Sequence, residues 1–153
     1  MLNKKKRVVK QLKELKKYGR PLRLAAEKWK KPWQILISTT LSARTRDEKT
    51  IEVCRVLFKK YRSVNDLANA NLEEIQKIIR TVNFYITKSK NIIKCAIVLY
   101  EKHNGKVPLD FNKLIELPGV GRKTANVFLS EMGFDEIGVD THVFQLSRKL
   151  GWT

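Results

Sequence analysis

The chain has 153 residues, 42% of them hydrophobic, which suits one domain with a real core. Its formal net charge is +17, and residues 1–31 carry +11 of it, with 13 Lys or Arg against two acids. Such a charge favours a polyanion, such as nucleic acid, as the binding partner. A solubilising surface or a contact with an anionic membrane stays open as the alternative. No apolar run is long enough for a membrane span and none follows the basic N-terminus as in a signal peptide, so we expect an intracellular protein.

The first 41 residues predict two helices joined by a charged connector. Residues 4–17 form a basic helical pattern with Val8, Leu12 and Leu15 on one stripe. We therefore expect a basic N-terminal helix and connector over residues 1–31 and a second domain over residues 32–153. Its first segment, Trp33–Leu41, has strand propensity, but its length and neighbours favour a buried helix.

The segment from residue 45 to residue 117 carries the signals of successive short helices. Thr45 and Glu48 make a capping box for a helix that runs through Tyr61. Further helix starts are marked by N-cap residues and by an apolar helical pattern: Ser63, Asn71, Asp110 and residues 90–102. No segment alternates with period two for long, so the predicted fold class is all-α.

The two cysteines, Cys54 and Cys95, lie within apolar helical patterns. Buried free thiols are the favoured interpretation, with a disulfide or a metal site as the alternative. Two isolated cysteines cannot hold an iron–sulfur cluster, which needs four thiolates. The sequence also lacks the HExxH, CxxC and paired-carboxylate patterns, so we predict no catalytic metal.

The most informative stretch is LPGVGRKTA, residues 117–125. Gly119 and Gly121 permit a turn whose backbone can approach a ligand closely. A helix then begins near Arg122 and runs to about Met132. A glycine turn that leads into a helix N-terminus presents backbone N–H groups and the positive end of a helix dipole, which suits an anionic phosphate.

Two residues in and after this stretch suggest covalent chemistry. Lys123 lies in the first turn of the predicted helix, and its amine is a candidate nucleophile that forms a Schiff base with a carbonyl-like carbon. Asp140, in the run VDTHV, is predicted to cap a helix that begins at Thr141. Separately, Lys123 is typical of a solvated surface lysine and Asp140 of a simple cap, so the prediction depends on the chain bringing them together.

The run LPGVGRKTA followed by VDTHV resembles the helix–hairpin–helix and Gly/Pro-Asp signature of endonuclease III-type DNA glycosylases. The resemblance covers essentially the whole chain and implies the helical domain of that family. It implies that Lys123 attacks C1′ of a damaged nucleotide, while Asp140 stabilises positive charge on the sugar and assists proton transfer. Relatives that only remove bases lack this lysine, so the implied activity is a bifunctional glycosylase and abasic-site (AP) lyase.

The implied partner is double-stranded DNA that carries a damaged base, favoured to be an oxidised pyrimidine, or an abasic site. The residues that would contact DNA in the hairpin are Leu117, Gly119, Val120, Gly121 and Arg122. By position, Arg44 is the filler of the space left by an extruded base, and Phe84 is an apolar wedge in the base stack.

Alternatives stay open for four residues near the implied site. Arg44 stands where the family often has Gln, so the way this chain reads the opposite base is open. A phosphate contact or a helix-flanking cation explains Arg44 equally well. For Phe84 the alternative is core packing. Asp47 matches an acidic family position near the site, although a first-turn helix acid explains it too. His142 is expected to orient its turn rather than to act as an acid or base.

Two features of the family are missing from this sequence. Many members carry a 4Fe–4S cluster on four cysteines near the C-terminus; the two cysteines do not support it, and we expect no cofactor. Members also continue with further helices that pack on the N-terminal helix. Because Val8, Leu12 and Leu15 would lack that cover, we expect a C-terminally truncated domain, with a partner, an unstable N-terminal helix or an artificial truncation as the explanations.

Two other classes of protein also fit the sequence. One is a non-catalytic or truncated helix–hairpin–helix module that binds DNA without reaction. The other is a protein-interaction domain whose basic surface is incidental.

Overall fold

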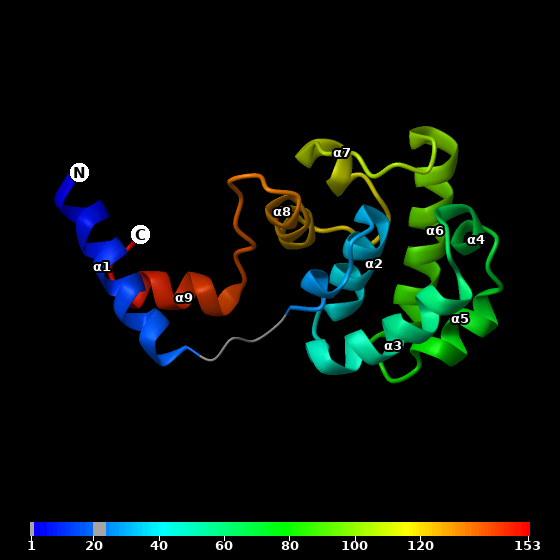
Figure 1. Cartoon of the computed structure of the whole chain (residues 1–153), viewed down its shortest axis with the longest axis horizontal. Helices are drawn as coiled ribbons and strands as arrows, with labels where there is room; N and C mark the ends of the chain where they lie inside the picture. Colours follow the sequence, from blue (N-terminus) through cyan, green and yellow to red (C-terminus); the bar gives the residue numbers. More distant parts are fainter. Residues whose placement is uncertain (1, 20–23) are drawn as a thin grey trace. The chain divides into compact units, whose positions relative to one another are not determined.

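The computed structural model describes residues 2–19 and 24–153 (Figure 1). Within them the chain is all-helical and contains no strand, which confirms the predicted fold class. Residues 20–23 of the predicted connector lie outside this part. The helices are α1 (Leu2–Tyr18), the 3-10 helix η1 (Ala26–Lys28), α2 (Pro32–Ser42), α3 (Asp47–Lys60), α4 (Val64–Ala68), α5 (Leu72–Ile79), α6 (Tyr85–His103), α7 (Phe111–Ile115), α8 (Arg122–Glu131) and α9 (Thr141–Lys149).

The chain divides into two compact units. One unit combines Met1–Leu22 with Val139–Thr153, and the other contains Arg23–Gly138. The predicted domain boundary between residues 31 and 32 stays a prediction. None of the described helices is both long and apolar enough to cross a membrane.

Helix α2 lies at the centre of the larger unit. Pro32 occupies its first turn, and the side chains of Trp33, Leu36 and Leu41 are at most 8% exposed. The hydroxyls of Ser38, Thr39 and Thr40 are also buried, and each donates to a backbone carbonyl one turn earlier. These bonds satisfy the polar groups inside the helix, so the segment is a buried helix as predicted, despite its strand propensity.

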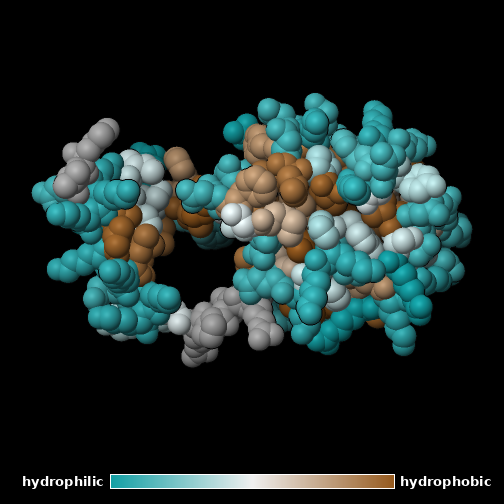
Figure 2. All heavy atoms as spheres, turned by 45° about the horizontal axis from the view of Figure 1, so that its top comes forward, coloured by the Kyte–Doolittle hydropathy of each residue, from teal (hydrophilic) through white to brown (hydrophobic). Residues whose placement is uncertain are grey.

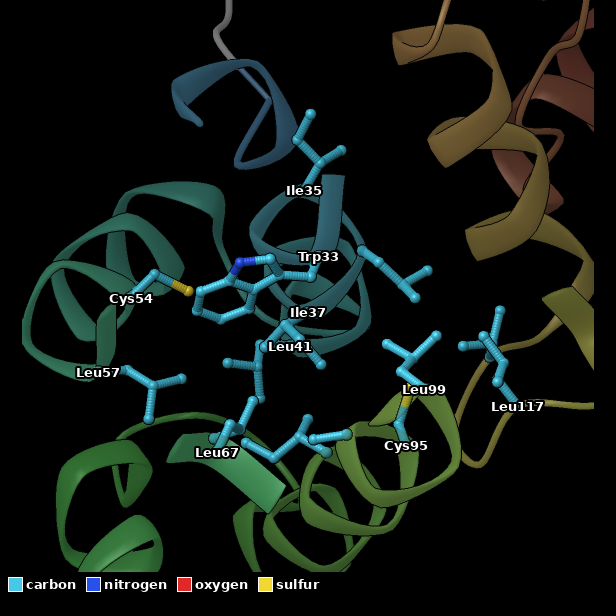
Figure 3. Close-up of a cluster of buried hydrophobic side chains, with 14 of the residues drawn as sticks. Trp33, Ile35, Ile37, Leu41, Cys54, Leu57, Leu67, Cys95, Leu99 and Leu117 are labelled. Atoms are coloured by element: carbon cyan, nitrogen blue, oxygen red, sulfur yellow. The ribbon is translucent and has the colours of Figure 1, made fainter. Parts of the chain in front are cut away.

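The core around α2 is formed by α3, α6, α8 and η1 (Figure 3). The ring of Phe58 meets Trp29 and Trp33 edge to face, at centroid distances of 4.8 and 5.1 Å. Cys54 and Cys95 are buried in this core as free thiols, which confirms that prediction. Burial raises the pKa of both thiols, that of Cys95 to about 12, so neither is a reactive thiolate at neutral pH.

Most predicted helix starts are confirmed, but the helix predicted over residues 90–102 begins earlier, at Tyr85. Ser63 forms a full capping box with Asp66, and the side chains of Asn71 and Asp110 accept the expected backbone N–H bonds. The capping box predicted at Thr45 is wrong, because α3 begins one residue later and its N-cap, Arg46, makes no side-chain cap. The Thr45 hydroxyl instead accepts the backbone N–H of Asn83 at 3.1 Å.

The smaller unit contains α1 and α9. The Arg7 guanidinium donates to the carbonyl of Gly151, and the indole N–H of Trp152 donates to Gln11, both at 2.7 Å. Leu12 and Leu15 remain 48% and 45% exposed, and apolar side chains of α9 are exposed as well (brown in Figure 2). Two helices bury little of their apolar surface, so this unit has a small core.

Candidate active site

The glycine turn between α7 and α8 is anchored in the core of the larger unit. The side chains of Leu117 and Val120 are 3% and 6% exposed, and the Val120 N–H donates to the Leu117 carbonyl at 3.0 Å. Gly119 has φ +79°, and a Cβ atom there would lie 2.8 Å from Cβ of Asn91 on α6. Any other residue at position 119 would force the Asn91 side chain or the turn to shift, so the turn packs closely on α6.

The N-terminus of α8 is an open end of a helix. Gly121 is its N-cap and provides no side-chain cap, whereas α7 begins at a capping aspartate, Asp110. The guanidinium of Arg122 lies 5.2 Å from the ring centroid of Phe111, which holds this cation at the same end. Backbone N–H groups, the helix dipole and Arg122 together provide the chemistry for binding a phosphate.

Of the predicted hairpin contacts, Gly119, Gly121 and Arg122 are exposed, while the side chains of Leu117 and Val120 are buried. Any contact from the two buried residues must therefore use their backbone. Their side chains instead position the turn.

Lys123 is exposed in the first turn of α8, as the sequence predicts. Val127 lies one turn further along the same helix, and the chain returns to this face at Gly138. A Cβ atom at Gly138 would overlap Cγ2 of Val127 and lie 3.6 Å from Cγ of Lys123. The absence of a side chain at Gly138 thus lets the backbone pack directly on the helix face that carries the predicted nucleophile.

Asp140 follows Gly138 by two residues and belongs to the smaller unit. It is the N-cap of α9, and its Oδ1 accepts the Val143 N–H at 2.9 Å, as the sequence predicts. His142 is exposed in the first turn of the same helix. The catalytic roles of Asp140 and Lys123 stay predictions.

Arg44 and Phe84 come from two different loops and meet at one exposed place. The Arg44 guanidinium lies 5.7 Å from the centroid of the Phe84 ring. Both residues have left-handed backbone conformations, with φ of 55° and 60°, which are uncommon outside glycine. The Phe84 side chain is 61% exposed, so it does not pack in the core.

The two loops are tied together by Asn83 and by the buried Lys88. The Asn83 side-chain amide donates to the carbonyl of Arg44, and the Asn83 N–H donates to Thr45. The Lys88 ammonium donates to the carbonyls of Leu41, at 2.7 Å, and Ala43. Burial lowers the pKa of Lys88 to about 8.

Lys88 is absent from the sequence-based candidates. The signal that could have found it is its place four residues before Ile92, on the apolar stripe that continues through Cys95 and Leu99. Lysine is rarely buried without hydrogen-bond partners, so a lysine on an apolar stripe indicates a buried ammonium with polar partners.

Asp47 has a structural role, because its Oδ1 accepts the Ala25 N–H at 3.2 Å.

A shallow hollow of about 690 Å³ lies beside Arg44. It is lined by Arg44, Thr45, Arg46, Lys49, Thr81 and Asn83. Three of these residues are cations and none is an acid, so the hollow suits an anion.

The described residues include no cluster of side chains suited to a metal ion. Among the described residues, no group of three or more His, Cys, Asp or Glu side chains is close enough to hold a metal ion. Cys54 and Cys95 are buried on separate helices, and two thiols cannot supply the four thiolates that an iron–sulfur cluster needs. We therefore assign no step to such a group.

The sequence of this chain matches a known protein family. The sequence profile described as HhH-GPD superfamily base excision DNA repair protein matches residues 37–153. The chain belongs to the HhH-GPD superfamily. Endonuclease III of Thermotoga maritima is 44% identical over 123 residues, which are 79% of this chain and 57% of that protein. The chain thus spans just over half the length of the curated relatives it matches.

Solved structures of the superfamily agree with the fold. A non-covalent endonuclease III–DNA complex matches with a TM-score of 0.86 at 39% identity, over 99% of this chain and 70% of that one. A trapped endonuclease III–DNA covalent intermediate, in its estranged-adenine complex, matches with a TM-score of 0.77 at 44% identity, over 80% of this chain and 58% of that one. These likenesses confirm the resemblance inferred from LPGVGRKTA and VDTHV.

Proposed function

We propose that the chain acts as a base-excision-repair DNA glycosylase with AP lyase activity. The observation that carries this proposal is the exposed Lys123 in the first turn of α8, directly after an open phosphate-binding helix end, in a chain of the HhH-GPD superfamily. The endonuclease III–DNA complexes among its structural relatives support duplex DNA as the partner. A protein with this function works where genomic DNA lies, in the nucleoid or nucleus.

The proposed reaction uses one amine and one carboxylate. The neutral Lys123 amine attacks C1′ of the extruded nucleotide, the N-glycosidic bond breaks, and the base leaves with the bonding electron pair and a proton. Asp140 stabilises the positive charge that develops on the sugar and assists the proton transfers. The sugar ring opens to a Schiff base on Lys123. Loss of a proton from C2′ then expels the 3′ phosphate oxygen by β-elimination and nicks the strand.

DNA is held mainly through its phosphates in this proposal. The backbone N–H groups at Gly121 and the Arg122 cation bind the strand beside the lesion. The endonuclease III likeness favours oxidised pyrimidines as substrates. We assign no cofactor to the reaction.

Borohydride trapping on abasic-site DNA tests the proposal. We expect the wild-type chain to form a covalent complex and Lys123→Ala to form none. Lys113→Ala removes an exposed lysine from the neighbouring helix α7 and is the matched control, which should trap like the wild type.

Asp140→Asn keeps a side chain suited to an N-cap, so it should bind DNA but lose most base excision. Trapping that survives Lys123→Ala would exclude this lysine as the nucleophile.

A non-catalytic DNA-binding module is the second candidate. The uncapped N-terminus of α8, with Arg122 beside it, favours this candidate, because such a helix end binds a phosphate without any reaction. In that case, well-folded wild-type protein would bind abasic-site DNA and form no trapped complex.

A further inference from the structure

Arg122 is a cation at the end of a helix where a positive charge is unfavourable. It is the first residue of α8, and the positive end of the helix dipole repels a cationic side chain there. The side chain is exposed, and within the described part of the chain it forms no ion pair with a carboxylate. Without another contact, we expect the guanidinium to extend into solvent, away from the helix end where a phosphate would bind.

The ring of Phe111 supplies such a contact. Its centroid lies 5.2 Å from Cζ of Arg122, within the range of a cation–π interaction. The ring is itself fixed, because Phe111 is half-buried, packs against the hydrophobic core and begins helix α7 directly after its N-cap, Asp110. A guanidinium on a fixed support loses less conformational freedom when a ligand binds.

We propose that Phe111 is a positioning residue for DNA binding, whose ring holds Arg122 beside the open end of α8. The proposal rests on the proposed function, because it is there that Arg122 is assigned to the strand beside the lesion. Phe111 acts in this role only through Arg122. The attraction is electrostatic, between the electron-rich face of the ring and the guanidinium. An aliphatic side chain could fill much of the same space in the core, but it would lose this attraction.

Equilibrium binding to a duplex that carries a tetrahydrofuran abasic-site analogue tests the proposal. Phe111→Leu keeps an apolar side chain and removes the ring. We expect it to weaken binding by about two- to fivefold, the range that the energy of an exposed cation–π pair allows. Phe111→Tyr keeps an aromatic face and should recover the wild-type affinity. Trifluorophenylalanine at position 111 keeps the shape of the ring but withdraws electron density from its face, so it should weaken binding as Phe111→Leu does.

An Arg122→Gln background shows whether the ring acts through the arginine. In that background Phe111→Leu should have no further effect on binding, because the side chain that it positions is gone. Phe144→Leu is the matched control, since it removes a ring that lies 5.9 Å from Arg148 on α9. Any effect of this control on binding should be the same with and without Arg122.

Two results would overturn the proposal. If Phe111→Leu weakened binding equally with and without Arg122, the ring would act through the fold and not through the guanidinium. If trifluorophenylalanine left binding unchanged, the electron density of the ring face would have no role. Urea unfolding of each variant checks that it is folded. Should Phe111→Leu unfold the chain, the trifluorophenylalanine variant, which keeps the shape of the native side chain, decides the matter in both backgrounds.

Failure of the proposed function gives a different result. The tetrahydrofuran analogue has no aldehyde and cannot form a Schiff base, so binding to it does not depend on catalysis. A wild-type chain that binds this duplex but forms no trapped complex on abasic-site DNA would refute the glycosylase, while the comparison of Phe111 variants still decides their role in binding. A wild-type chain with no affinity for the duplex would refute both.

Discussion

Gly119 and Gly121 are two residues apart, yet the structure gives them different roles. Gly119 has a left-handed backbone and touches Asn91, whereas Gly121 has φ −92° and no atom within 4 Å of a Cβ placed there. Gly119 therefore serves the packing of the turn on α6. Gly121 serves the approach of a ligand to the open end of α8.

Replacing each glycine with alanine should therefore affect a different property: stability at Gly119 and DNA binding at Gly121. Gly119→Ala should lower the free energy of unfolding by about 1–3 kcal/mol, because it adds backbone strain and a clash. Gly121→Ala should cost less than about 1 kcal/mol in stability but weaken duplex binding, since the methyl group stands where a phosphate approaches. Urea unfolding and DNA titration of both variants measure the two effects. Equal stability losses would contradict this assignment.

At the scale of elements, Lys88 joins the end of α2 to the start of α6. Its ammonium donates hydrogen bonds to the carbonyls of Leu41 and Ala43. Carbonyls at the C-terminal end of a helix have no partner within the helix. Burial holds the pKa of Lys88 at about 8, below its ordinary value of 10.5. Above pH 8 the folded chain loses this proton while the unfolded chain keeps it up to about pH 10.5.

The contribution of Lys88 to stability should therefore rise with pH across this window. Because the unfolded state binds more protons there, the free energy of unfolding of the wild type should rise relative to that of Lys88→Met between pH 8 and 10.5. Urea unfolding of both proteins at pH 7, 9 and 10 measures the difference. Comparison of the two proteins cancels the titration of Cys54, Cys95 and Tyr61. Lys90→Met, at an exposed position in α6, is the control for replacing a lysine in this helix.

Signals that depend on residues close together in the sequence, such as N-cap residues, predict the helix starts well. Ser63, Asn71, Asp110 and Asp140 were identifiable as N-caps because a cap bonds to a backbone N–H only three residues away. Thr45 was mispredicted because its hydroxyl bonds to Asn83, 38 residues further along the chain. The Arg44–Phe84 contact and the Lys88 bonds are likewise long-range, and helical periodicity carries no information about them.

At the scale of the whole molecule, the charge is the dominant feature. The net charge of +17 includes a dense cluster of lysines along α1, and teal, hydrophilic side chains cover much of the face in view in Figure 2. Helical patterning allowed the all-α class to be predicted. It did not reveal that residues 139–153 form a compact unit with the N-terminal helix, since that pairing joins the two ends of the chain.

This charge predicts a steep salt dependence of DNA binding. Each phosphate contact releases counterions, so the logarithm of the association constant should fall linearly with the logarithm of the salt concentration. Replacing Lys10 and Lys13 with Gln should make the slope shallower and weaken binding to damaged and intact duplexes alike. Binding isotherms between about 50 and 200 mM salt measure this. A flat response would favour a protein-interaction domain instead.

The burial of both cysteines has a practical consequence for experiments on this protein. Because maleimides and iodoacetamides react with accessible thiolates, the native chain should resist labelling while it is folded. A third cysteine placed at an exposed site such as Lys90 would then take up a fluorophore selectively. Movement of the nearby loops on DNA would become visible by fluorescence without removing any native residue of the core.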